Sequence, residues 1–574
     1  MSDEEMSYED RLLTAFESIA ESLKILAEKP PITIQIRSNG NIDLEEVTPT
    51  VYQTRNVTKK TTSVLLSDIG KKIGRTVLVE GEVAQIKQTS GPTIFTVVDE
   101  SGTGNAAAFI EAGVRAYPEV ELGDIVGLTG EVMQRNNQLQ IEVASMTVLE
   151  PEDAARVRVR IDAALDERAE PPELPFLIES EVLEALRPQM RQVAKEIRKA
   201  VLTARPIVLR HHADADGICA AVAIEQAVTA LLRESGGDFD AEYFLFKRSP
   251  SKAPFYEIED ITRDLDFALK DNARYGQKMP MILLMDNGST DEDIPSLKVT
   301  RIYDLPVMVV DHHHPDESVD EYLIGHVNPY HVGGDYGITA GMLGTEIARL
   351  VNPAVEDQIR HLPAIAGVGD RSEAPERARY LELAAPEYSE DDCRDIALAL
   401  DYEQFWLRFS DGREIVKDIL NLGGDPGRHE KFVDLLVEEA NRAIEEQMEA
   451  IMPHIESRML PNGAHLFMLD VELFAHRFTF PPPGKTSGEV HDRLVRERPG
   501  EPVVTLGFGP DFAVLRSRGV MMNIPRMVRE LHTEIVGGGV SGGGHLVVGS
   551  IKFVEGMRDA VLESLIQKIG EAPI

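Results

Sequence analysis

The chain has 574 residues, which suggests about four domains of roughly 150 residues each, and its 43% of hydrophobic residues can form buried cores. It carries 97 acidic and 59 basic residues, a formal net charge of −38, which indicates a solvated acidic surface and argues against a protein that coats polyanions generally. A nucleic-acid enzyme is not excluded, because such binding needs only local basic contacts.

No stretch of the sequence reaches the roughly 18 uninterrupted apolar residues of a membrane span, so no membrane partner is expected. The N-terminus, "MSDEEMSYED", lacks the basic and apolar regions of a signal peptide. The two cysteines, Cys219 and Cys393, form no CxxC motif, which argues against a disulfide framework and a cysteine-rich structural zinc site. Together these features favour a cytoplasmic protein.

Residues 1–62 are expected to form a separate N-terminal region. Between residues 8 and 29 apolar residues recur at steps of four and three, which predicts a helix that ends at Pro30-Pro31. This helix could pack on its own domain or form a short coiled coil, which makes the chain a candidate homo-oligomer. A hairpin that turns at Asn39-Gly40 is predicted to follow.

Residues 63–150 are predicted to form a small closed barrel of five short strands with glycine-rich turns. The phrases "VEGEV", "FTVVDESG" and "GDIVGLTGEV" resemble an OB-fold. Taken singly, each phenylalanine of this region is more often a core residue, and OB-folds also bind proteins and sugars. The residues that could stack on bases or contact phosphates are Lys87, Phe95, Phe109, Arg115 and Arg135.

The rest of the chain is predicted to be a multidomain α/β protein. Residues 151–200, which are charged and marked by prolines, are interpreted as a linker with a helix. Residues 201–375 alternate buried strands with helices, which is typical of a parallel sheet covered on both faces. Residues 376–460 are expected to be mainly helical and to end in a long helix near Pro453, and residues 461–574 return to strands and helices.

Four strands of residues 201–375 are predicted to end on metal-type ligands. The segments are "PIVLRHHADADG", "MPMILLMDNG", "VMVVDHHHPD" and "PAIAGVGDRSE". Because ligands gather at the carboxyl ends of parallel strands, the residues that these segments supply should converge. They are His212, Asp214, Asp216, Asp286, Asp311, His312, His313 and Asp370.

Several carboxylates with one or two histidines suit Mn²⁺ or Mg²⁺ better than zinc. The carboxylates exceed what one ion needs, so two ions about 4 Å apart, bridged by one carboxylate, are predicted. Without metal the aspartates would repel one another. Taken singly, an aspartate after a strand is more often a helix cap, and a run of histidines is often a solvated loop. The joint occurrence of the four segments favours the metal site.

These segments resemble the DHH phosphoesterase superfamily in HxDxDG (212–217), a lone Asp286, the DHH triplet (311–313) and Asp370. "GGGH" at 542–545 looks like the motif of the companion DHHA1 domain, and "VLRSRG" looks like its substrate-contacting strand. The long helix that joins the two lobes is similar to the RecJ branch of single-strand-specific exonucleases. The preceding OB-fold and the acidic composition suggest an archaeal RecJ-like nuclease.

The resemblance implies a DHH catalytic domain at 201–375, a helical insertion with a connecting helix at 376–460, and a DHHA1 substrate-binding domain at 461–574. It also implies a set of metal ligands, in which one residue, Asp286, would bridge two Mn²⁺ ions. Asp214 and Asp216 would bind one ion each. His312 and Asp370 would complete the coordination of one ion, and His212 would help to hold the other ion. Small-molecule members have their first histidine four residues before the first aspartate, where this chain has Arg210, whereas His212 lies two residues before Asp214.

Catalytic and substrate-binding roles are implied in the same way. Asp311 would orient His312, and His313 would contact the scissile phosphate. Bacterial RecJ enzymes carry their OB-fold after the DHHA1 domain, whereas here it comes first, so strand polarity does not transfer. The residues implied to hold a neighbouring phosphate or base are Arg516, Ser517, Gly542, Gly543, Gly544 and His545.

The sequence thus predicts a Mn²⁺-dependent phosphodiesterase, with Mg²⁺ as the alternative ion, that degrades single-stranded DNA or RNA from an end by two-metal hydrolysis. Single-stranded nucleic acid and replication or DNA repair proteins would be its partners. Two alternatives stay open: a phosphodiesterase for short oligonucleotides or cyclic dinucleotides, and a non-catalytic replication scaffold. The scaffold would be marked by lost ligands, and no aspartate of the set is missing.

Overall fold

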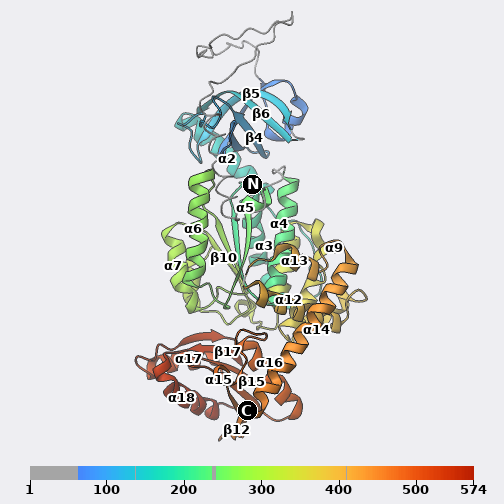
Figure 1. Cartoon of the computed structure of the whole chain (residues 1–574). Helices are drawn as coiled ribbons and strands as arrows, with labels where there is room; N and C mark the ends of the chain where they lie inside the picture. The colour runs from blue at the N-terminus through green and yellow to red at the C-terminus, as the bar shows by residue number, and fades with distance from the viewer. Residues whose placement is uncertain (1–61, 136–137, 236–240, 409) are drawn as a thin grey trace, which may run out of the picture. The chain divides into compact units, whose positions relative to one another are not determined.

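The computed structural model describes residues 62–135, 138–235, 241–408 and 410–574 (Figure 1). The helix predicted for residues 8–29 and the hairpin predicted at Asn39-Gly40 lie outside the described residues. All of the described residues belong to one compact unit of the chain.

The first described region is a small β-barrel. Its strands are β1 (Thr62–Ser63), β2 (Thr76–Gln88), β3 (Thr93–Val98), β4 (Thr103–Ala108), β5 (Ile125–Arg135) and β6 (Gln138–Val148). They follow the order β1-β2-β3-β4-β6-β5, and a further pairing of β2 with β5 closes the barrel. Buried and partly exposed residues alternate along β2, as expected for a strand with one face on a core. The predicted barrel is confirmed, and the two-residue β1 extends it through a parallel pairing with β2.

Two helices connect the barrel to the next sheet, α2 (Pro151–Arg168) and α3 (Glu181–Leu202). Helix α3 begins after Ser180, whose hydroxyl oxygen accepts the backbone N–H of Leu183. The buried residues of α3 recur at helical spacing and belong to the core of the next sheet, so α3 is part of that layer.

The middle of the chain forms a five-stranded sheet in which every neighbouring pair is parallel. Its strands are β7 (Ile207–His212), β8 (Phe246–Ser251), β9 (Met281–Met285), β10 (Val307–Val310) and β11 (Gly325–Val327). The order is β11-β10-β9-β7-β8. Because β10, β9 and β7 are adjacent, the residues that follow these three strands are brought to one edge of the sheet.

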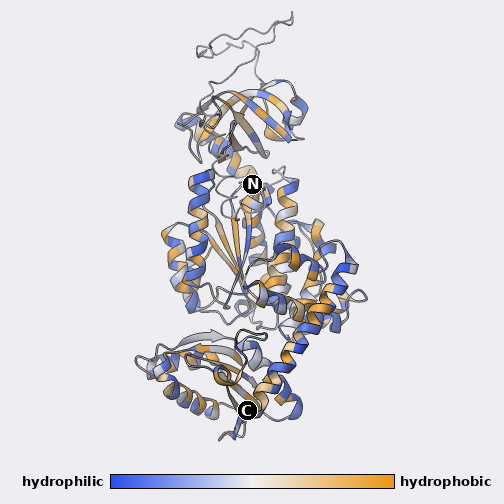
Figure 2. Ribbon diagram, viewed as in Figure 1, coloured by the Kyte–Doolittle hydropathy of each residue, from blue (hydrophilic) through white to orange (hydrophobic). Residues whose placement is uncertain are grey.

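Helices cover both faces of this sheet (Figure 1). The helices of this part of the chain are α4 (Ala215–Glu234), α5 (Ala241–Leu245), α6 (Ile258–Tyr275), α7 (Ile294–Ile302), α8 (Ala340–Val351), α9 (Glu356–Ile359) and α10 (Leu362–Gly369). Ile207 and Leu209 of β7 pack in one core with α3, α4 and α8, while Val208 packs in another with α6 and α7. Burial on both faces gives the strands the continuous apolar runs that are orange in Figure 2. The predicted parallel sheet with helices on both faces is confirmed.

Helix α4 is the one helix of the described residues that is long and apolar enough to cross a membrane. However, 83% of that stretch is buried inside the protein, as in the core helix of a sheet domain. Its apolar character is therefore explained by packing.

A helical segment follows the sheet, with helices α11 (Pro375–Ala384), α12 (Glu390–Leu407), α13 (Arg413–Ile419) and α14 (Pro426–Ile451). The long α14 ends just before Pro453, in agreement with the sequence, because proline has no N–H to continue a helix.

The C-terminal region is a six-stranded sheet with helices. The strands are β12 (Glu456–Met459), β13 (His465–Asp470), β14 (Val503–Phe508), β15 (Phe512–Arg518), β16 (Ser541–Gly544) and β17 (Val548–Lys552). The helices are α15 (Val471–Phe474), α16 (Pro483–Glu497), α17 (Ile524–Glu534) and α18 (Arg558–Glu571). The strands follow the order β12-β13-β14-β15-β17-β16, and only β13 and β14 pair in parallel within this sheet. This is the further α/β region that the sequence predicts.

A buried ion-pair cluster fixes α6 to the end of β7. Two guanidinium nitrogens of Arg210 donate to the two carboxylate oxygens of Asp264 at 2.8 Å each, and a third donates to Asp260 at 3.0 Å. Only 5% of the Arg210 side chain is exposed. Arg210, which stands where small-molecule DHH enzymes have their first histidine, is therefore engaged in packing.

We expect the substitution Arg210→Ala to destabilise the sheet region by about 3–5 kcal/mol, because it leaves two buried carboxylates without their cation. Chemical denaturation would measure this loss. Lys270→Ala is the control, since Lys270 pairs with Asp266 on the exposed side of the same helix, where such pairs contribute at most about 1 kcal/mol. Equal effects of the two substitutions would contradict this account.

Candidate metal centre

Three adjacent strands of the central sheet end at the predicted ligands. Strand β7 ends at His212, β9 is followed by Asp286, and β10 is followed by Asp311. Asp286 takes a left-handed backbone conformation, with a φ of 58°, which is unfavourable for most residues with a side chain and is tolerated best by Asn and Asp. The middle strand, β9, is therefore followed by a tight turn at Asp286, and the other candidate ligands surround this residue.

Two of the aspartates also stabilise helix ends. The Asp214 side chain accepts the backbone N–H of Gly217 at 3.0 Å and caps α4, which is the ordinary structural role of such a residue. The two oxygens of Asp216 accept the N–H groups of Ala340 and Gly341 at 2.9 Å each, at the beginning of α8. Helix N-termini thus hold both carboxylates in place.

Gly217 is required by the close approach of the chain at this point. A Cβ atom there would lie 2.3 Å from the carbonyl oxygen of His212 and 3.0 Å from Oδ2 of Asp286. A larger residue would therefore push the start of α4 away from the candidate ligands.

Asp286 lies between two histidines. Its Oδ1 is 3.2 Å from Nε2 of His312, and its Oδ2 is 3.5 Å from Nδ1 of His212. Both oxygens are buried, and neither accepts a hydrogen bond from a residue that the structure describes. Three groups of potential ligand atoms contain Asp286. It is grouped with His212 and Asp214, with Asp216 and His312, and with Asp311 and His313.

The carboxylates and imidazoles of the cluster shift one another's pKa values. Burial, followed by the charge of Asp286, raises the pKa of Asp216 well above its usual range. Burial would also raise the pKa of Asp214, but the charge and hydrogen bond of His212 outweigh it and lower that pKa. Burial lowers the pKa of His312, yet the surrounding carboxylates outweigh it and raise the pKa. Carboxylates and imidazoles are ligands suited to hard or borderline divalent ions, and the oxygens of Asp286 lack hydrogen-bond donors among the described residues, so the residues present fit two such ions.

Asp370 lies at the edge of the cluster, with Oδ2 3.9 Å from Nδ1 of His312. Burial raises the pKa of Asp370 to about 6. The prediction that a strand precedes Asp370 is wrong, because residues Leu362–Gly369 form helix α10. Its small residues let helices approach closely: a Cβ atom at Gly341 of α8 would lie 2.4 Å from Cβ of Ala366. The periodicity of a short apolar run does not distinguish a buried strand from a buried helix.

The role implied for Asp311 is wrong in one detail. Its Oδ1 lies 2.8 Å from Nδ1 of His313, whereas Nδ1 of His312 lies 2.7 Å from the carbonyl oxygen of Tyr336. The same Oδ1 also accepts the backbone N–H of His312 at 2.8 Å. Asp311 therefore orients His313, and a backbone carbonyl orients His312.

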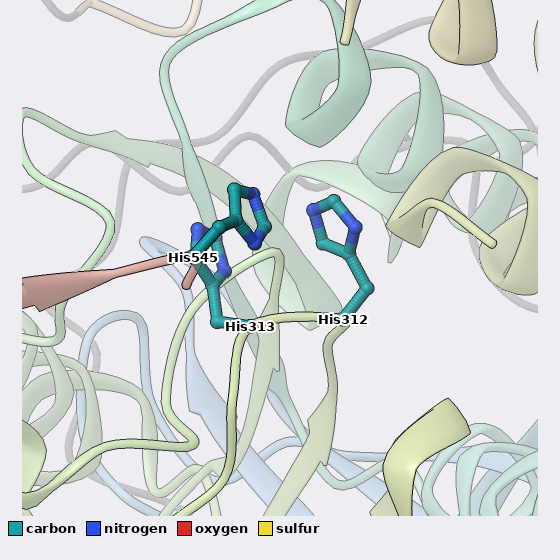
Figure 3. Close-up of side chains that lie close together, drawn as sticks. All are labelled: His312, His313 and His545. Carbon is teal, nitrogen blue, oxygen red and sulfur yellow. The ribbon is translucent and has the colours of Figure 1, made fainter. Parts of the chain in front are cut away.

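A residue of the C-terminal sheet region lies beside the DHH triplet (Figure 3). The rings of His545 and His313 are stacked, with centroids 4.6 Å apart and planes 3° apart, and His312 lies 4.9 Å from His545. Nδ1 of His545 is buried without a hydrogen-bond partner among the described residues. Burial and the charges of His313 and His312 lower the pKa of His545 well below its usual range, so a neutral imidazole lies there.

Arg516 and Ser517 project to opposite faces of β15, as successive strand residues do. The buried Nε of Arg516 has no hydrogen-bond partner within the described part of the chain. Burial and the nearby Arg371 lower the pKa of Arg516 to about 10. The Ser517 hydroxyl donates to the carbonyl oxygen of Val520 at 3.0 Å, so the structure does not bring it to Arg516.

The glycine segment contacts a residue that the sequence did not single out. The N–H of Gly542 donates to Oε1 of Glu292 at 3.0 Å, and a Cβ atom at Gly543 would lie 3.6 Å from both oxygens of that carboxyl group. Gly542 and Gly544 have φ values of 140° and 122°, which only glycine adopts readily. A carboxyl group thus occupies part of the environment expected to bind a phosphate.

Four of the five OB candidates are engaged within the protein. Phe95 is fully buried in the barrel core, edge-on to Tyr117, and cannot stack on a base. The other three engaged residues interact as follows: Arg115 donates to the carbonyl oxygen of Val120, Arg135 pairs with Glu142, and Lys87 lies over the ring of Phe244. Phe109 is exposed at 64% and remains available for stacking.

Comparison with known proteins assigns the family. Residues 77–149 match the family described as "OB-fold nucleic acid binding domain". The uncharacterized protein MJ1198 of Methanocaldococcus jannaschii is 45% identical over 560 residues, which cover 92% of this chain and 74% of that protein. A solved structure described as "Member of s1p family of ribosomal proteins PF0399 DHH domain" is 44% identical and covers 74% of this chain and 100% of that one, with a TM-score of 0.71. The chain belongs to the DHH family.

The family resemblance drawn from the sequence is thereby confirmed, as is the OB-fold. RecJ from Thermus thermophilus in complex with Mn²⁺ shows 15% identity, covers 72% of this DHH protein and 60% of that chain, and has a TM-score of 0.44. That likeness is too low to transfer an activity or a ligand.

Sequence analysis missed two further features of the DHH protein beside the cluster. Lys485 of α16 pairs with Asp401 of α12. Burial raises the pKa of Asp214, but His212 and then the charge of Lys485 lower it. Arg371, which follows Asp370, pairs with Asp492 at 2.6 Å. The position of Arg371 next to a candidate ligand was a usable signal, whereas nothing local to Lys485 points to a strand end far away in sequence.

The contact between Glu292 and Gly542 generates a pH prediction. Burial, followed by Asp291, raises the pKa of Glu292 to about 8 from its ordinary 4.5. When the pKa of a carboxyl group is higher in the folded protein than in the unfolded chain, the folded state is most stable at a pH below the unfolded pKa. That stability is lost as the pH rises through the folded pKa. Glu292→Gln keeps the acceptor oxygen but cannot ionise. We therefore expect the melting temperature of the parent to fall relative to this variant as pH rises from 4.5 to about 8.

Thermal melting across that pH range measures the effect, with the exposed Glu259→Gln as the matched control. A difference between parent and Glu292→Gln that stays constant with pH would show that Glu292 is ionised throughout.

Proposed function

We propose that the DHH protein is a phosphodiesterase that depends on divalent metal ions, with Mn²⁺ as the favoured ion, and shortens single-stranded DNA or RNA from an end. The proposal is carried by the position of Asp286, whose two buried oxygens lie near two different histidines, Oδ1 near His312 and Oδ2 near His212. Two ions that share a carboxylate are the arrangement used to hydrolyse phosphodiesters.

Two of the three ligand groups that contain Asp286 would each hold one ion. His212 and Asp214 would act with one oxygen of Asp286, and Asp216 and His312 would act with the other, joined by Asp370 at the edge. When bound, such ions act as Lewis acids toward the phosphoryl oxygens and lower the pKa of water.

The remaining residues would bind and position the substrate. His313, held by Asp311, would contact the scissile phosphate, and Asp311 keeps its ring in one orientation. Arg516, with its unpartnered Nε, and His545, with its unpartnered Nδ1, would each bind a neighbouring phosphate or base. The backbone of Gly542, Gly543 and Gly544 would complete that contact once the carboxyl group of Glu292 is displaced. Ser517 would not contact substrate, because its hydroxyl group is bonded to the carbonyl oxygen of Val520 at the end of β15.

The barrel would add binding of single strands, as its match to OB-fold nucleic acid binding domains supports. Its exposed Phe109 is the residue that the structure leaves available for stacking. Replication or repair proteins are the partners that such an activity would require.

A second candidate substrate is favoured by the engaged OB side chains. Because Lys87, Arg115 and Arg135 interact within the protein, the barrel offers few free cations to a long polyanion. Short oligonucleotides or cyclic dinucleotides would need only the metal centre and the C-terminal sheet region. A non-catalytic scaffold is disfavoured, because the ligand set is complete.

Digestion of end-labelled single-stranded DNA and RNA tests the proposal. We expect laddering from one end with Mn²⁺ and none with chelator, and the label position reports the polarity. Asp286→Ala should reduce cleavage to background without lowering the melting temperature in chelator, because it removes one of several repelling carboxylates. Intact polymers but hydrolysed dinucleotides would select the second candidate, and no hydrolysis of either by a folded protein would leave the scaffold.

Substrate binding by His545 is tested separately. We expect His545→Ala to weaken the binding of strand ends by about tenfold, the effect of losing one hydrogen bond to a charged group, while Mn²⁺ affinity stays unchanged. Fluorescence anisotropy and metal titration measure the two affinities. The exposed His476→Ala in the same sheet region is the control. Equal losses of both affinities would place His545 among the metal ligands.

A further inference from the structure

A second cluster of metal-type ligands follows the DHH segment in the sequence. It consists of Asp320 in a short helical turn (Glu317–Tyr322), His326 in β11, and His331 in the next turn (Pro329–Val332). One potential ligand atom from each residue lies within 4.8 Å of the others. None of these residues belongs to the groups that contain Asp286.

His326 is held rigidly within this cluster. Its Nδ1 is 2.7 Å from Oδ1 of Asp320, and its Nε2 is 3.0 Å from the hydroxyl oxygen of Ser289. The His326 side chain is 7% exposed, whereas Asp320 is 51% exposed. An ion bound at Nδ1 of His326 would select the tautomer whose proton is on Nε2. That N–H would donate to the hydroxyl oxygen of Ser289. A hydrogen-bond acceptor of this kind is typical of a metal-bound imidazole.

His331 supplies a third donor that packing does not use. Its ring lies edge-on to that of His326, with centroids 4.5 Å apart and planes at 89°. Neither of its ring nitrogens is hydrogen-bonded to a residue that the structure describes. The turn that carries it is fixed by backbone bonds, because the N–H of His331 donates to the carbonyl oxygen of Asn328. A simple histidine–aspartate hydrogen bond would not need this third residue.

We propose that Asp320, His326 and His331 bind one divalent ion of the later first-row transition series, such as Zn²⁺, Co²⁺ or Ni²⁺. Two imidazoles with one carboxylate suit these ions, whereas the carboxylate-rich centre around Asp286 suits Mn²⁺ or Mg²⁺. Three protein ligands leave coordination positions for water, and the exposed carboxylate of Asp320 gives access from solvent.

The site is linked to the DHH segment through side chains. Ser289, which contacts His326, accepts a hydrogen bond from the amide of Asn328, and that amide also donates to the carbonyl oxygen of His313 at 2.9 Å. Binding of an ion would therefore hold the loop between β10 and the second cluster in one arrangement, independently of the ions at Asp286.

Co²⁺ titration of the full chain tests this site by its visible absorption. The titration uses a variant that carries both Asp216→Ala and Asp286→Ala, so that the other centre does not contribute. We expect one Co²⁺ per chain, displaced by Zn²⁺, with an affinity about tenfold or more weaker after His331→Ala or Asp320→Asn. His465→Ala is the matched control, because His465 forms a histidine–carboxylate pair with Glu501 at 3.1 Å without a third ligand among the described residues.

Two results would overturn the proposal. One is the absence of Co²⁺ and Zn²⁺ binding in the folded background variant. The other is binding that His331→Ala and Asp320→Asn leave unchanged, which would place the ion elsewhere. Asp320 is half exposed, so the Asp320→Asn variant is expected to fold. It therefore tests the site even if His331→Ala fails to fold.

Discussion

The arrangement around the DHH segment depends on the carboxylate of Asp286, which is buried between His212 and His312 at the end of the middle strand of three. A buried carboxylate without hydrogen-bond donors is costly unless a cation compensates it. Two histidines and three further aspartates converge on the same point, and each additional carboxylate increases the repulsion. The fold tolerates this concentration of charge because the parallel sheet fixes the strand ends and the N-termini of α4 and α8 hold Asp214 and Asp216.

The same constraint explains the neighbouring residues. Gly217 has no side chain because the His212 carbonyl oxygen and Asp286 leave no space for one. Arg210 lies on the same strand, yet its guanidinium pairs with Asp264 and Asp260, so it contributes packing where small-molecule relatives have a histidine. Asp311 orients His313, and the carbonyl oxygen of Tyr336 orients His312, so adjacent histidines are positioned by different partners. In the proposed function, His312 would hold a metal ion while His313 contacts substrate.

The sequence predicts the barrel, the parallel sheet and the convergence of three strand ends, because these depend on local patterns and on the geometry of parallel strands. It does not predict α10, since small apolar residues carry no periodic signal that separates a close-packed helix from a buried strand. The contact between Glu292 and Gly542 joins residues 250 positions apart, and no local pattern encodes it. Phe95 was a plausible base-stacking residue by composition, but only the closed barrel shows that it is core. Tertiary packing thus determines which candidates remain accessible.

The charge distribution is compatible with an acidic protein that acts on a polyanion. Two divalent ions would bring four positive charges, which balance the four carboxylates Asp214, Asp216, Asp286 and Asp370. The metal centre would then be close to neutral, and Arg516, whose Nε has no hydrogen-bond partner among the described residues, would supply the positive charge that a phosphate requires. Elsewhere the acidic composition would repel nucleic acid, so the proposed substrate would bind only where cations are presented. Local binding of this kind would favour the proposed recognition of a strand end over non-specific coating of a polymer.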